Sequence, residues 1–461
     1  MRTKVISFSW IIVLRFILRQ AMIKLLHTNL KKFIAHSIVY SGRFLRVVGM
    51  KRIGLGLILK GRRVDEVTIA DSIIQNIIQT NIGKELELHK LLPRDSDPPI
   101  EKFNSRILIL KLPILENDAV IEKGVIIFKF TETFLPVYFS LDLCFLRKYF
   151  NIILEPSWAG YSIAEILIWT ALSPQKVIVL SPDEADFRFL TKLKSNLVPV
   201  PLGAADWVNP NIFYKVYNVK KIYDVIYVAN FNPAKRVDRY IRAIIRINRN
   251  LKNFNAALVC AGHGSSKREI MTMIEWASNK CNISFFNGMC QSDLNMLLNQ
   301  SKVNVLLSLK EGANKGLTEG LFSGTPAVLL SENVGVKRAN INNQTGKIIP
   351  DRALEETLIW FSDNYENYYS NIWANEHISP TISTQILADK IEEIEESEGR
   401  ACSKALYPKV NQPELNYLNE ENSWLLAERS ELLTQFSLGC NEENIINFLQ
   451  RLQKQAVTNK T

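Results

Sequence analysis

Short apolar strands alternate with helical segments along this chain, and the alternation occurs twice. In the first half, the segments read as buried strands are 106–112, 124–130, 151–156 and 176–181. In the second half they are 224–229, 255–262, 282–288, 302–309 and 326–331. All are rich in Val, Ile and Leu and lack a period of two, which is typical of parallel strands covered on both faces. The sequence therefore predicts an α/β protein with two doubly wound, Rossmann-like domains.

The length of the chain agrees with two domains, because 461 residues exceed what one ordinary hydrophobic core organises. Residues 201–222 contain Pro201, Gly203 and Pro210 and few long apolar runs, so they are predicted to link the domains. The predicted division is an N-terminal arm over 1–60, one Rossmann-like domain over 61–205 and a second over 206–370. Residues 371–461 are predicted to form a helical C-terminal segment.

The N-terminal arm is basic and apolar. Residues 1–60 contain 12 Lys and Arg side chains and no Asp or Glu, whereas the remaining residues carry 44 Lys and Arg against 46 Asp and Glu. The apolar run 5–14 is shorter than the roughly 20 residues that span a membrane. One interpretation is a segment lying on an anionic membrane surface, where each basic residue adds roughly 1 kcal/mol. The others are a helical extension packed on the protein, a transit peptide and a mis-assigned start.

The cysteines and histidines form no recognisable metal or redox motif. Six cysteines occur without a CxxC pair, and five histidines occur without an HExxH pattern. Unpaired cysteines are expected in a reducing compartment, so we expect a cytoplasmic protein, peripheral on the membrane if the arm binds there. No metal site is predicted from these residues.

The stretch 311–320 reads EGANKGLTEG and directly follows the predicted strand 302–309. Ligands of parallel α/β sheets bind at the carboxyl ends of strands, and the unpaired N–H groups of a following helix favour phosphate. Gly312 and Gly316 let the main chain approach a ligand closely. Glu311 can accept hydrogen bonds from sugar hydroxyls, and Glu319, expected at or just inside the first helical turn, from a ribose diol. The pattern predicts a nucleotide-sugar site on a helix that ends at Gly324.

Two glutamates eight positions apart, a helix and the SGTP turn at 323–326 resemble the signature of family 4 retaining glycosyltransferases, of the "glycosyl transferases group 1" type. YVANFNPAKRVDRYIRAI (227–244) resembles the family segment G-R-x-x-x-x-K-G. ALVCAGHG (257–264) resembles the family strand that ends in G-x-G. The resemblance is good over 220–350, fair over 105–220 and negligible over 1–100.

The resemblance implies a GT-B fold, in which two Rossmann-like domains face a cleft. It implies transfer of a sugar from a nucleotide-sugar to a glycan or lipid-linked acceptor, with retention at the anomeric carbon. Lys235 would contact the diphosphate, Glu311 the transferred sugar and Glu319 the ribose. The further donor-site residues that it implies are Asn230, Arg236, Gly262, Gly264, Gly312, Ala313, Asn314, Lys315, Gly316 and Leu317. No metal or other cofactor is expected, because helix N-termini and Lys235 can supply the positive charge.

The sequence departs from the family pattern at three places. Asn230 stands where the family has an Arg, so Arg236 or Lys315 is expected to supply the missing counter-charge. The usual Gly-Phe-Gly after the first Glu is Gly-Ala-Asn at 312–314. Many members place a His at a strand end of the first domain, and no His occurs between residues 90 and 262. Glu155 and Trp158 follow a comparable strand and either hold an acceptor sugar or simply pack at the strand end.

Three alternatives are kept beside this interpretation. The first is a GT-B protein that binds sugar nucleotides without transferring the sugar, or an epimerase acting on them. The second is a membrane- or nucleic-acid-binding module that uses the basic arm; nucleic acid is disfavoured because the excess charge is confined to 1–60. The third concerns Asp95-Ser96-Asp97, which is similar to the metal-binding DxD of GT-A enzymes. It lies in a proline-rich stretch without a preceding strand, and we interpret it as a turn.

Overall fold

The computed structural model describes residues 29–85, 100–262, 264–411 and 415–458. The chain forms two compact units. The first unit contains Lys32–Asn209 together with Pro380–Thr461, and the second contains Pro210–Ser379. Within the described ranges, no helix combines the length and the apolar character that crossing a membrane requires.

The first unit is built on a five-stranded sheet in the order β1-β4-β5-β6-β7. Its strands are β1 (Ile107–Lys111), β4 (Gly124–Lys129), β5 (Phe150–Glu155), β6 (Val177–Leu180) and β7 (Leu197–Val200). Strands β4 to β7 are parallel, but β1 runs antiparallel to β4. The prediction of a parallel strand at 106–112 is therefore wrong. A hairpin of β2 (Ile114–Glu116) and β3 (Ala119–Glu122) returns the chain directly from β1 to β4, and a parallel pair needs a longer crossover.

Short helices follow the strands of this unit. They are α5 (Thr131–Ser140), α6 (Leu143–Tyr149), α7 (Ala164–Leu167) and α8 (Glu184–Leu193), with 3-10 turns η2 (Ile100–Arg106), η3 (Ile168–Leu172) and η4 (Ala204–Trp207). Residues 161–172 have the apolar pattern of a longer helix, but they form only a single α-turn, α7, continued by η3. Asp142 and Asp183 cap α6 and α8 by accepting two backbone N–H groups each.

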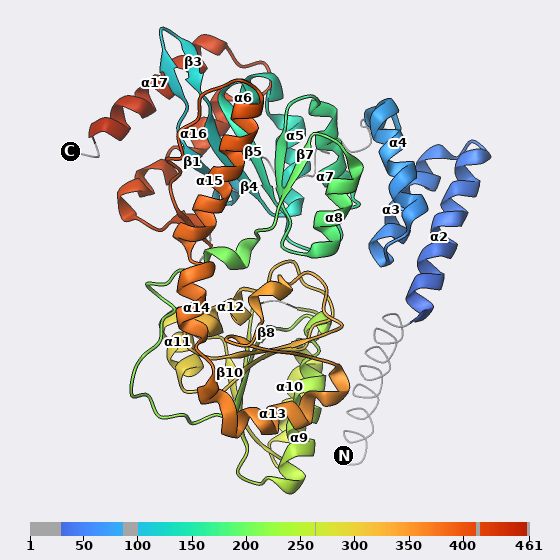
Figure 1. The fold of residues 1–461 in the computed structure, drawn as a ribbon, viewed down its shortest axis with the longest axis vertical. Coiled ribbons are helices and arrows are strands. Elements are labelled where there is room, and N and C mark those ends of the chain that lie inside the picture. The colour runs from blue at the N-terminus through green and yellow to red at the C-terminus, as the bar shows by residue number, and fades with distance from the viewer. Residues whose placement is uncertain (1–28, 86–99, 263, 412–414, 459–461) are drawn as a thin grey trace, which may run out of the picture. The chain divides into compact units, whose positions relative to one another are not determined.

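Part of the basic N-terminal arm is a helical layer of the first unit. The arm contributes α2 (Asn29–Val47) and most of α3 (Lys51–Val64). The next helix, α4 (Thr68–Glu85), lies beyond the arm and packs beside α8 (Figure 1). Ala35, Val39 and Ile58 are fully buried in the hydrophobic core of this unit. From residue 29 onward the arm is therefore packed on the protein, as one of the interpretations of the sequence proposed.

Residues 380–458 also belong to the first unit. They form α15 (Pro380–Ser397), β14 (Lys409–Asn411), β15 (Leu415–Tyr417), η9 (Glu420–Leu426), α16 (Arg429–Gln435) and α17 (Glu442–Thr458). The Tyr417 hydroxyl donates to the Ile109 carbonyl over 2.7 Å, which ties this segment to β1. The segment thus contains a β-hairpin among its helices and completes the core of the first unit.

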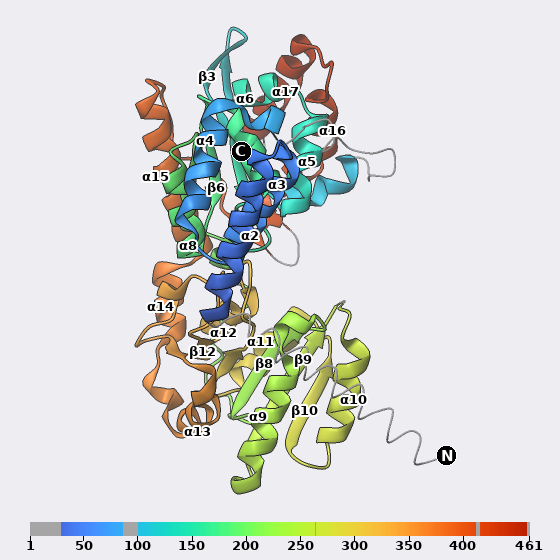
Figure 2. The same cartoon turned by 90° about the vertical axis from the view of Figure 1, so that its right-hand side faces the viewer.

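The second unit contains a six-stranded parallel sheet in the order β10-β9-β8-β11-β12-β13. Its strands are β8 (Val225–Asn230), β9 (Asn255–Ala261), β10 (Asn282–Asn287), β11 (Asn304–Leu306), β12 (Ala327–Leu330) and β13 (Gly346–Ile349). The five predicted strands are all present, and β13 was not predicted. Figure 2 shows β8, β9 and β10 side by side, with α9 and α10 next to them.

The helices of the second unit that connect these strands are α9 (Val237–Asn250), α10 (Lys267–Ala277), α11 (Gln291–Asn299) and α12 (Lys315–Phe322). The last strand is followed by α13 (Leu354–Asn364) and α14 (Ser370–His377). Cys290 is the N-cap of α11, because the helix begins at Gln291. Each unit has a mainly parallel sheet with flanking helices, so the predicted fold class with two Rossmann-like units is confirmed.

Candidate functional site

Three neighbouring strands of the second unit deliver the predicted donor residues to one edge of the sheet. Strands β9, β8 and β11 lie side by side and are parallel, so their carboxyl ends meet at the same edge. β8 ends at Asn230, β9 ends just before Gly262, and the chain leaves β11 toward Glu311. The predicted positions therefore converge as expected for a ligand site of a parallel sheet.

An ion pair at this edge joins Lys235 and Glu311. The Lys235 ammonium donates to Oε1 of Glu311 over 2.5 Å, and the Ser308 hydroxyl donates to the same oxygen over 2.6 Å. Both charged side chains are largely buried, with 12% and 6% of their surfaces exposed. The Tyr227 hydroxyl donates to the Lys235 carbonyl, which fixes the main chain from which the ammonium extends. A cation and a carboxylate are thus held against each other with little freedom.

The loop after Glu311 enters α12 through a capped helix start. Asn314 is the N-cap, and its side-chain oxygen accepts from the N–H of Leu317 over 2.8 Å. Asn304, on β11, donates to the carbonyl of Gly316 over 2.7 Å and holds the first turn against the sheet. Asn314, which departs from the family pattern, therefore has a local structural role.

Glu319 lies deeper in α12 than predicted. It is the fifth residue of the helix and so belongs to its second turn, not to the first. Only 7% of its surface is exposed. The predicted end of the helix is confirmed: Gly324 follows it with φ of +77°, a left-handed conformation that glycine adopts without strain.

Gly262 and Gly264 shape the turn that follows β9. Gly262 has φ of +74°, in the region that favours glycine. A Cβ atom on Gly264 would lie 2.1 Å from the carbonyl carbon of Phe231, so only glycine fits between this turn and the loop after β8. Ser266 strengthens the contact because its N–H donates to the Phe231 carbonyl over 3.1 Å. Both glycines therefore have backbone reasons for their positions beside the site.

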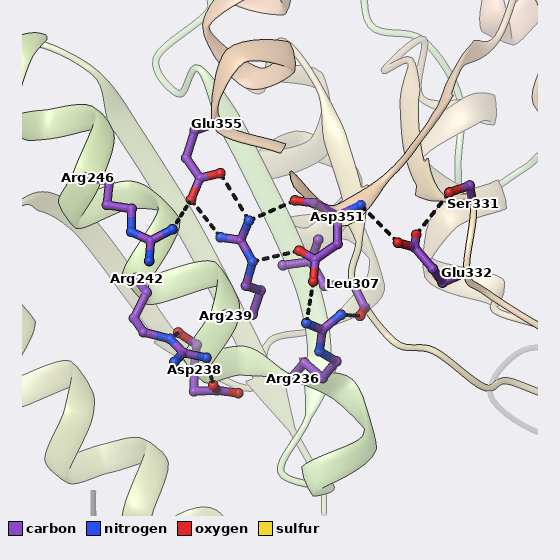
Figure 3. A network of polar contacts seen from close by, with 10 residues as sticks. All are labelled: Arg236, Asp238, Arg239, Arg242, Arg246, Leu307, Ser331, Glu332, Asp351 and Glu355. Carbon is purple, nitrogen blue, oxygen red and sulfur yellow. Dashed lines mark hydrogen bonds and ion pairs between the residues drawn. The ribbon is translucent and has the colours of Figure 1, made fainter. Parts of the chain in front are cut away.

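Arg236 is committed to an internal ion network (Figure 3). Its guanidinium contacts Asp351 at 2.8 Å and the Leu307 carbonyl at 3.2 Å, and its surface is 4% exposed. Arg239 contacts the other carboxylate oxygen of Asp351 at 2.7 Å and also pairs with Glu355. Burial alone would raise the pKa of Asp351, but the two guanidinium groups hold it well below its ordinary value. These contacts join α9 to the segment that begins α13.

Glu155 and Trp158, the predicted acceptor-side residues, have different environments. Glu155 is 1% exposed, and its carboxylate accepts from Lys409 at 2.6 Å and from Asn411 at 3.2 Å, with Lys129 at 4.0 Å. Trp158 has 46% of its surface exposed. The carboxylate is thus fully occupied by partners that include two from β14, more than 250 residues away in the chain.

Two residues that position the site, Ser308 and Asn304, were not predicted from the sequence. Ser308 and Asn304 hold Glu311 and the helix start, yet both look like ordinary polar residues at the end and the beginning of a short strand. A serine three positions before the motif glutamate is the one local hint. The Asp95-Ser96-Asp97 stretch lies outside the described residues, as does the histidine between Gly262 and Gly264.

Comparison with known proteins identifies the second unit. Residues 210–376 match the family model described as "Glycosyl transferases group 1". No curated protein matches the chain significantly.

Solved structures similar to the chain include S. aureus TarM, at 16% identity and a TM-score of 0.45 over 59% of this chain and 54% of that one. They also include the pneumococcal O-GlcNAc transferase GtfA in complex with UDP and GlcNAc, at 16% identity and a TM-score of 0.41 over 54% and 53%. A third is the sucrose-phosphate synthase of Thermosynechococcus elongatus, at 13% identity and a TM-score of 0.47 over 60% of this chain and 74% of that one.

The chain spans about half the length of the first two of these structures. Identities and TM-scores this low do not carry an activity or an acceptor from those proteins to this chain. The family match rests on the sequence of the second unit itself and agrees with the resemblance read from its motifs. Residues 210–376 are therefore a domain of the group 1 glycosyltransferase family.

Proposed function

We propose that this protein is a glycosyltransferase that moves a sugar from a nucleotide-sugar to a glycan or lipid-linked acceptor, with retention at the anomeric carbon. The observation that carries the proposal is the contact between Lys235 and Glu311 at the carboxyl ends of β8 and β11. It pairs a cation suited to a diphosphate with a carboxylate suited to sugar hydroxyls, beside the N-terminus of α12.

The proposed chemistry is electrostatic. The bond between the anomeric carbon and the diphosphate oxygen breaks, and the acceptor hydroxyl oxygen bonds to the anomeric carbon. Negative charge develops on the departing nucleotide diphosphate, which takes up the hydroxyl proton. The Lys235 ammonium and the N–H groups at the start of α12 are positioned to stabilise that charge, an effect that is often the largest single term in catalysis. Glu311 orients the sugar by accepting hydrogen bonds from its hydroxyls, and Glu319 accepts hydrogen bonds from the hydroxyls of the ribose. No metal ion is needed for these roles, because the chain supplies the positive charge itself.

A screen of nucleotide-sugars tests the donor assignment. UDP-, GDP- and ADP-sugars are added to the full-length protein, and the melting temperature is measured, because a ligand that binds only the folded state raises stability. We expect one nucleotide class to raise the melting temperature in wild type and to have a much smaller effect in Lys235→Ala. No shift with any nucleotide would contradict the proposed site.

Incubation with the stabilising donor separates the three enzymatic outcomes. Mass spectrometry of the products distinguishes transfer to an acceptor or to water from conversion of the donor into an isomer of equal mass, as an epimerase would produce. Transfer or hydrolysis supports the proposal, whereas isomerisation or an unchanged donor contradicts it. The coupling constant of the anomeric proton in the product then reports retention or inversion.

We also propose that α2 lies on an anionic membrane surface. Phe33, Tyr40, Phe44 and Val47 repeat at helical spacing along α2, and each exposes at least half of its surface. Lys31, Lys32, Arg43 and Arg46 lie on the same helix, which has no acidic residue. Exposed aromatic side chains among basic ones fit the interfacial region of a charged bilayer.

Co-sedimentation with vesicles tests this contact. Wild type is expected to sediment with vesicles of phosphatidylglycerol, and a Phe44→Glu, Val47→Glu variant is expected to remain in the supernatant. Ile114→Glu, which changes an exposed apolar residue elsewhere on the first unit, serves as the matched control and should bind like wild type. Equal binding by all three proteins would remove α2 as the membrane contact.

A further inference from the structure

The first unit contains an open cavity of about 830 Å³ that is distant in the chain from the donor site. Its basic lining residues are Lys123, Arg147, Lys148, Lys176 and Arg400. The remaining lining residues are Cys144, Pro174, Gln175, Ser397 and Glu398. Five cations from four separate segments of the chain therefore face one hollow.

The cavity lies at the amino ends of three neighbouring parallel strands. Lys123 directly precedes β4, Arg147 and Lys148 precede β5, and Lys176 directly precedes β6. Glu155, in contrast, is at the carboxyl end of β5. Sugar and nucleotide ligands of doubly wound sheets bind at the carboxyl ends, so this hollow is not the acceptor site that the fold leads one to expect.

The positive charge of the cavity is only partly compensated. Arg400 contacts Glu395 at 2.5 Å and also pairs with Glu398, and Lys148 pairs with Glu442. Among the residues that the structure describes, no carboxylate forms an ion pair with the three remaining cations, Lys123, Arg147 and Lys176. Counting these lining cations and their paired carboxylates, five positive charges face three negative ones.

Holding like charges together in a partly buried place has an electrostatic cost. Burial, together with the charge of Arg400, lowers the pKa of Lys123 even though Glu395 and Glu398 act in the opposite direction. An anion that enters the cavity would relieve this repulsion. The Gln175 side chain already donates to the Arg147 carbonyl over 3.0 Å, which fixes the two segments that carry Arg147 and Lys176.

We infer that this cavity is an anion-binding site that takes a phosphate- or diphosphate-bearing molecule, with Lys123, Arg147 and Lys176 as its principal contacts. The three cations that have no ion-pair partner, and the net charge of two that the lining keeps, suit a diphosphate, and arginine offers it two parallel donors. The phosphate can belong to a soluble metabolite or to a lipid headgroup, because both present the same chemistry. The inference does not depend on the proposed transferase activity.

Cys144 provides a local probe of occupancy. It lines the cavity and is exposed and free, while Cys290 is an exposed free cysteine in the second unit. Alkylation of the full-length protein by iodoacetamide is followed at both cysteines by peptide mass spectrometry, with and without inorganic pyrophosphate. We expect Cys144 to be alkylated about tenfold more slowly at a pyrophosphate concentration of roughly ten times the dissociation constant, with Cys290 unaffected.

Variants assign the protection to the cavity. Arg147→Gln combined with Lys176→Gln should abolish the protection of Cys144, whereas the charge-conserving pair Arg147→Lys and Lys176→Arg should retain it. Melting curves establish that both variants are folded. Lys235→Ala, which weakens the proposed donor site, should leave the protection unchanged, so the two proposals can fail separately.

A second arm identifies the source of the phosphate. Vesicles of phosphatidic acid replace pyrophosphate in the same alkylation assay. Protection by the vesicles points to a lipid headgroup, and protection by pyrophosphate alone points to a soluble ligand; both support the site. Absence of protection in both arms, or equal protection in the Arg147→Gln, Lys176→Gln variant, would overturn the inference.

Discussion

Lys235 and Glu311 are 76 positions apart in the chain, yet one hydrogen bond joins them. Each side chain limits the other, because the ammonium compensates a carboxylate that is almost fully buried. A substitution at either position therefore changes both the charge presented to a ligand and the balance of the unbound site. Stability and activity have to be measured together for these two residues.

We expect Lys235→Ala and Glu311→Ala each to lower kcat/KM by roughly 10²–10³, the usual effect of removing one group that stabilises developing charge. Steady-state kinetics with the donor that the nucleotide-sugar screen selects measure this effect. Lys252→Ala and Glu356→Ala, which change exposed residues of the same unit, are the matched controls and should retain activity. Rates similar to wild type in Lys235→Ala or Glu311→Ala, with folding intact, would show that the site is assigned wrongly.

Glu155 allows a structural role to be separated from acceptor binding. Its carboxylate compensates the buried Lys409 and faces Lys129, so Glu155→Gln should leave buried positive charge unpaired and cost about 3–5 kcal/mol of stability. Urea unfolding measures the loss. Trp158→Ala removes an exposed ring nearby in the sequence and should change stability little. A Glu155→Gln protein as stable as wild type, with a raised KM for the acceptor, would instead support the predicted acceptor role.

At the scale of single elements, what the sequence predicted well was local. The strand, loop and helix around 302–324 were predicted because an apolar run, two glycines and a terminal glycine all lie within that stretch. Asn314 was read there only as a departure from a pattern, although asparagine is among the favoured N-caps. The partners of Glu155 could not be predicted, because Lys409 and Asn411 come from a strand that lies beyond the whole second unit in the chain.

The pair of helices α2 and α3 meets at glycines. A Cβ atom on Gly54 would lie 2.5 Å from the Gly42 carbonyl oxygen, and one on Gly61 would lie 2.6 Å from a methyl group of Val39. The two helix backbones therefore approach each other so closely that there is no room for a side chain at Gly54 or Gly61. Basic charge made the arm conspicuous in the sequence, but this glycine contact is what allows it to pack.

Substitution of two glycines of α3, Gly54 and Gly56, should change the stability of the protein in opposite directions. Gly54→Ala is expected to lower the free energy of unfolding by about 1–3 kcal/mol, because the methyl group meets the backbone of α2. The methyl group of Gly56→Ala would point into open space. This substitution should raise the free energy of unfolding by about 0.5–1 kcal/mol, because alanine has a higher helix propensity than glycine. Chemical denaturation monitored by circular dichroism measures both. An equal response of the two variants would show that α2 and α3 do not pack as described.

For the whole molecule, two buried carboxylates, one in each unit, are expected to make stability depend on pH with opposite signs. Burial raises the pKa of Asp186 in the first unit to about 6, although the N–H groups of Gly160 and Tyr161 act against the shift. The folded state then binds more protons than the unfolded state between about pH 4 and pH 6, so stability falls as pH rises through this window. The pKa of Asp351 in the second unit is lowered instead. Its ion pairs therefore stabilise the folded state at every pH above the ordinary pKa of an aspartate, and this contribution is lost as the pH falls below that value.

Asp186→Asn tests the first of these effects. Wild type is expected to lose on the order of 2 kcal/mol from Asp186 between pH 4.5 and pH 7, and the variant should lack this component. Unfolding free energies of both proteins across that range, measured with urea, provide the comparison. Parallel pH profiles for wild type and Asp186→Asn would show that Asp186 titrates normally.

The second unit is inserted between two pieces of the first, and this arrangement has a consequence for biosynthesis. Ile445, Leu449 and Leu452 belong to α17 and are fully buried in the core of the first unit. That core is completed only after α17 leaves the ribosome, whereas all of 210–379 emerges earlier and can fold as a continuous piece. The order of folding is therefore expected to be the reverse of the order in which the two units begin.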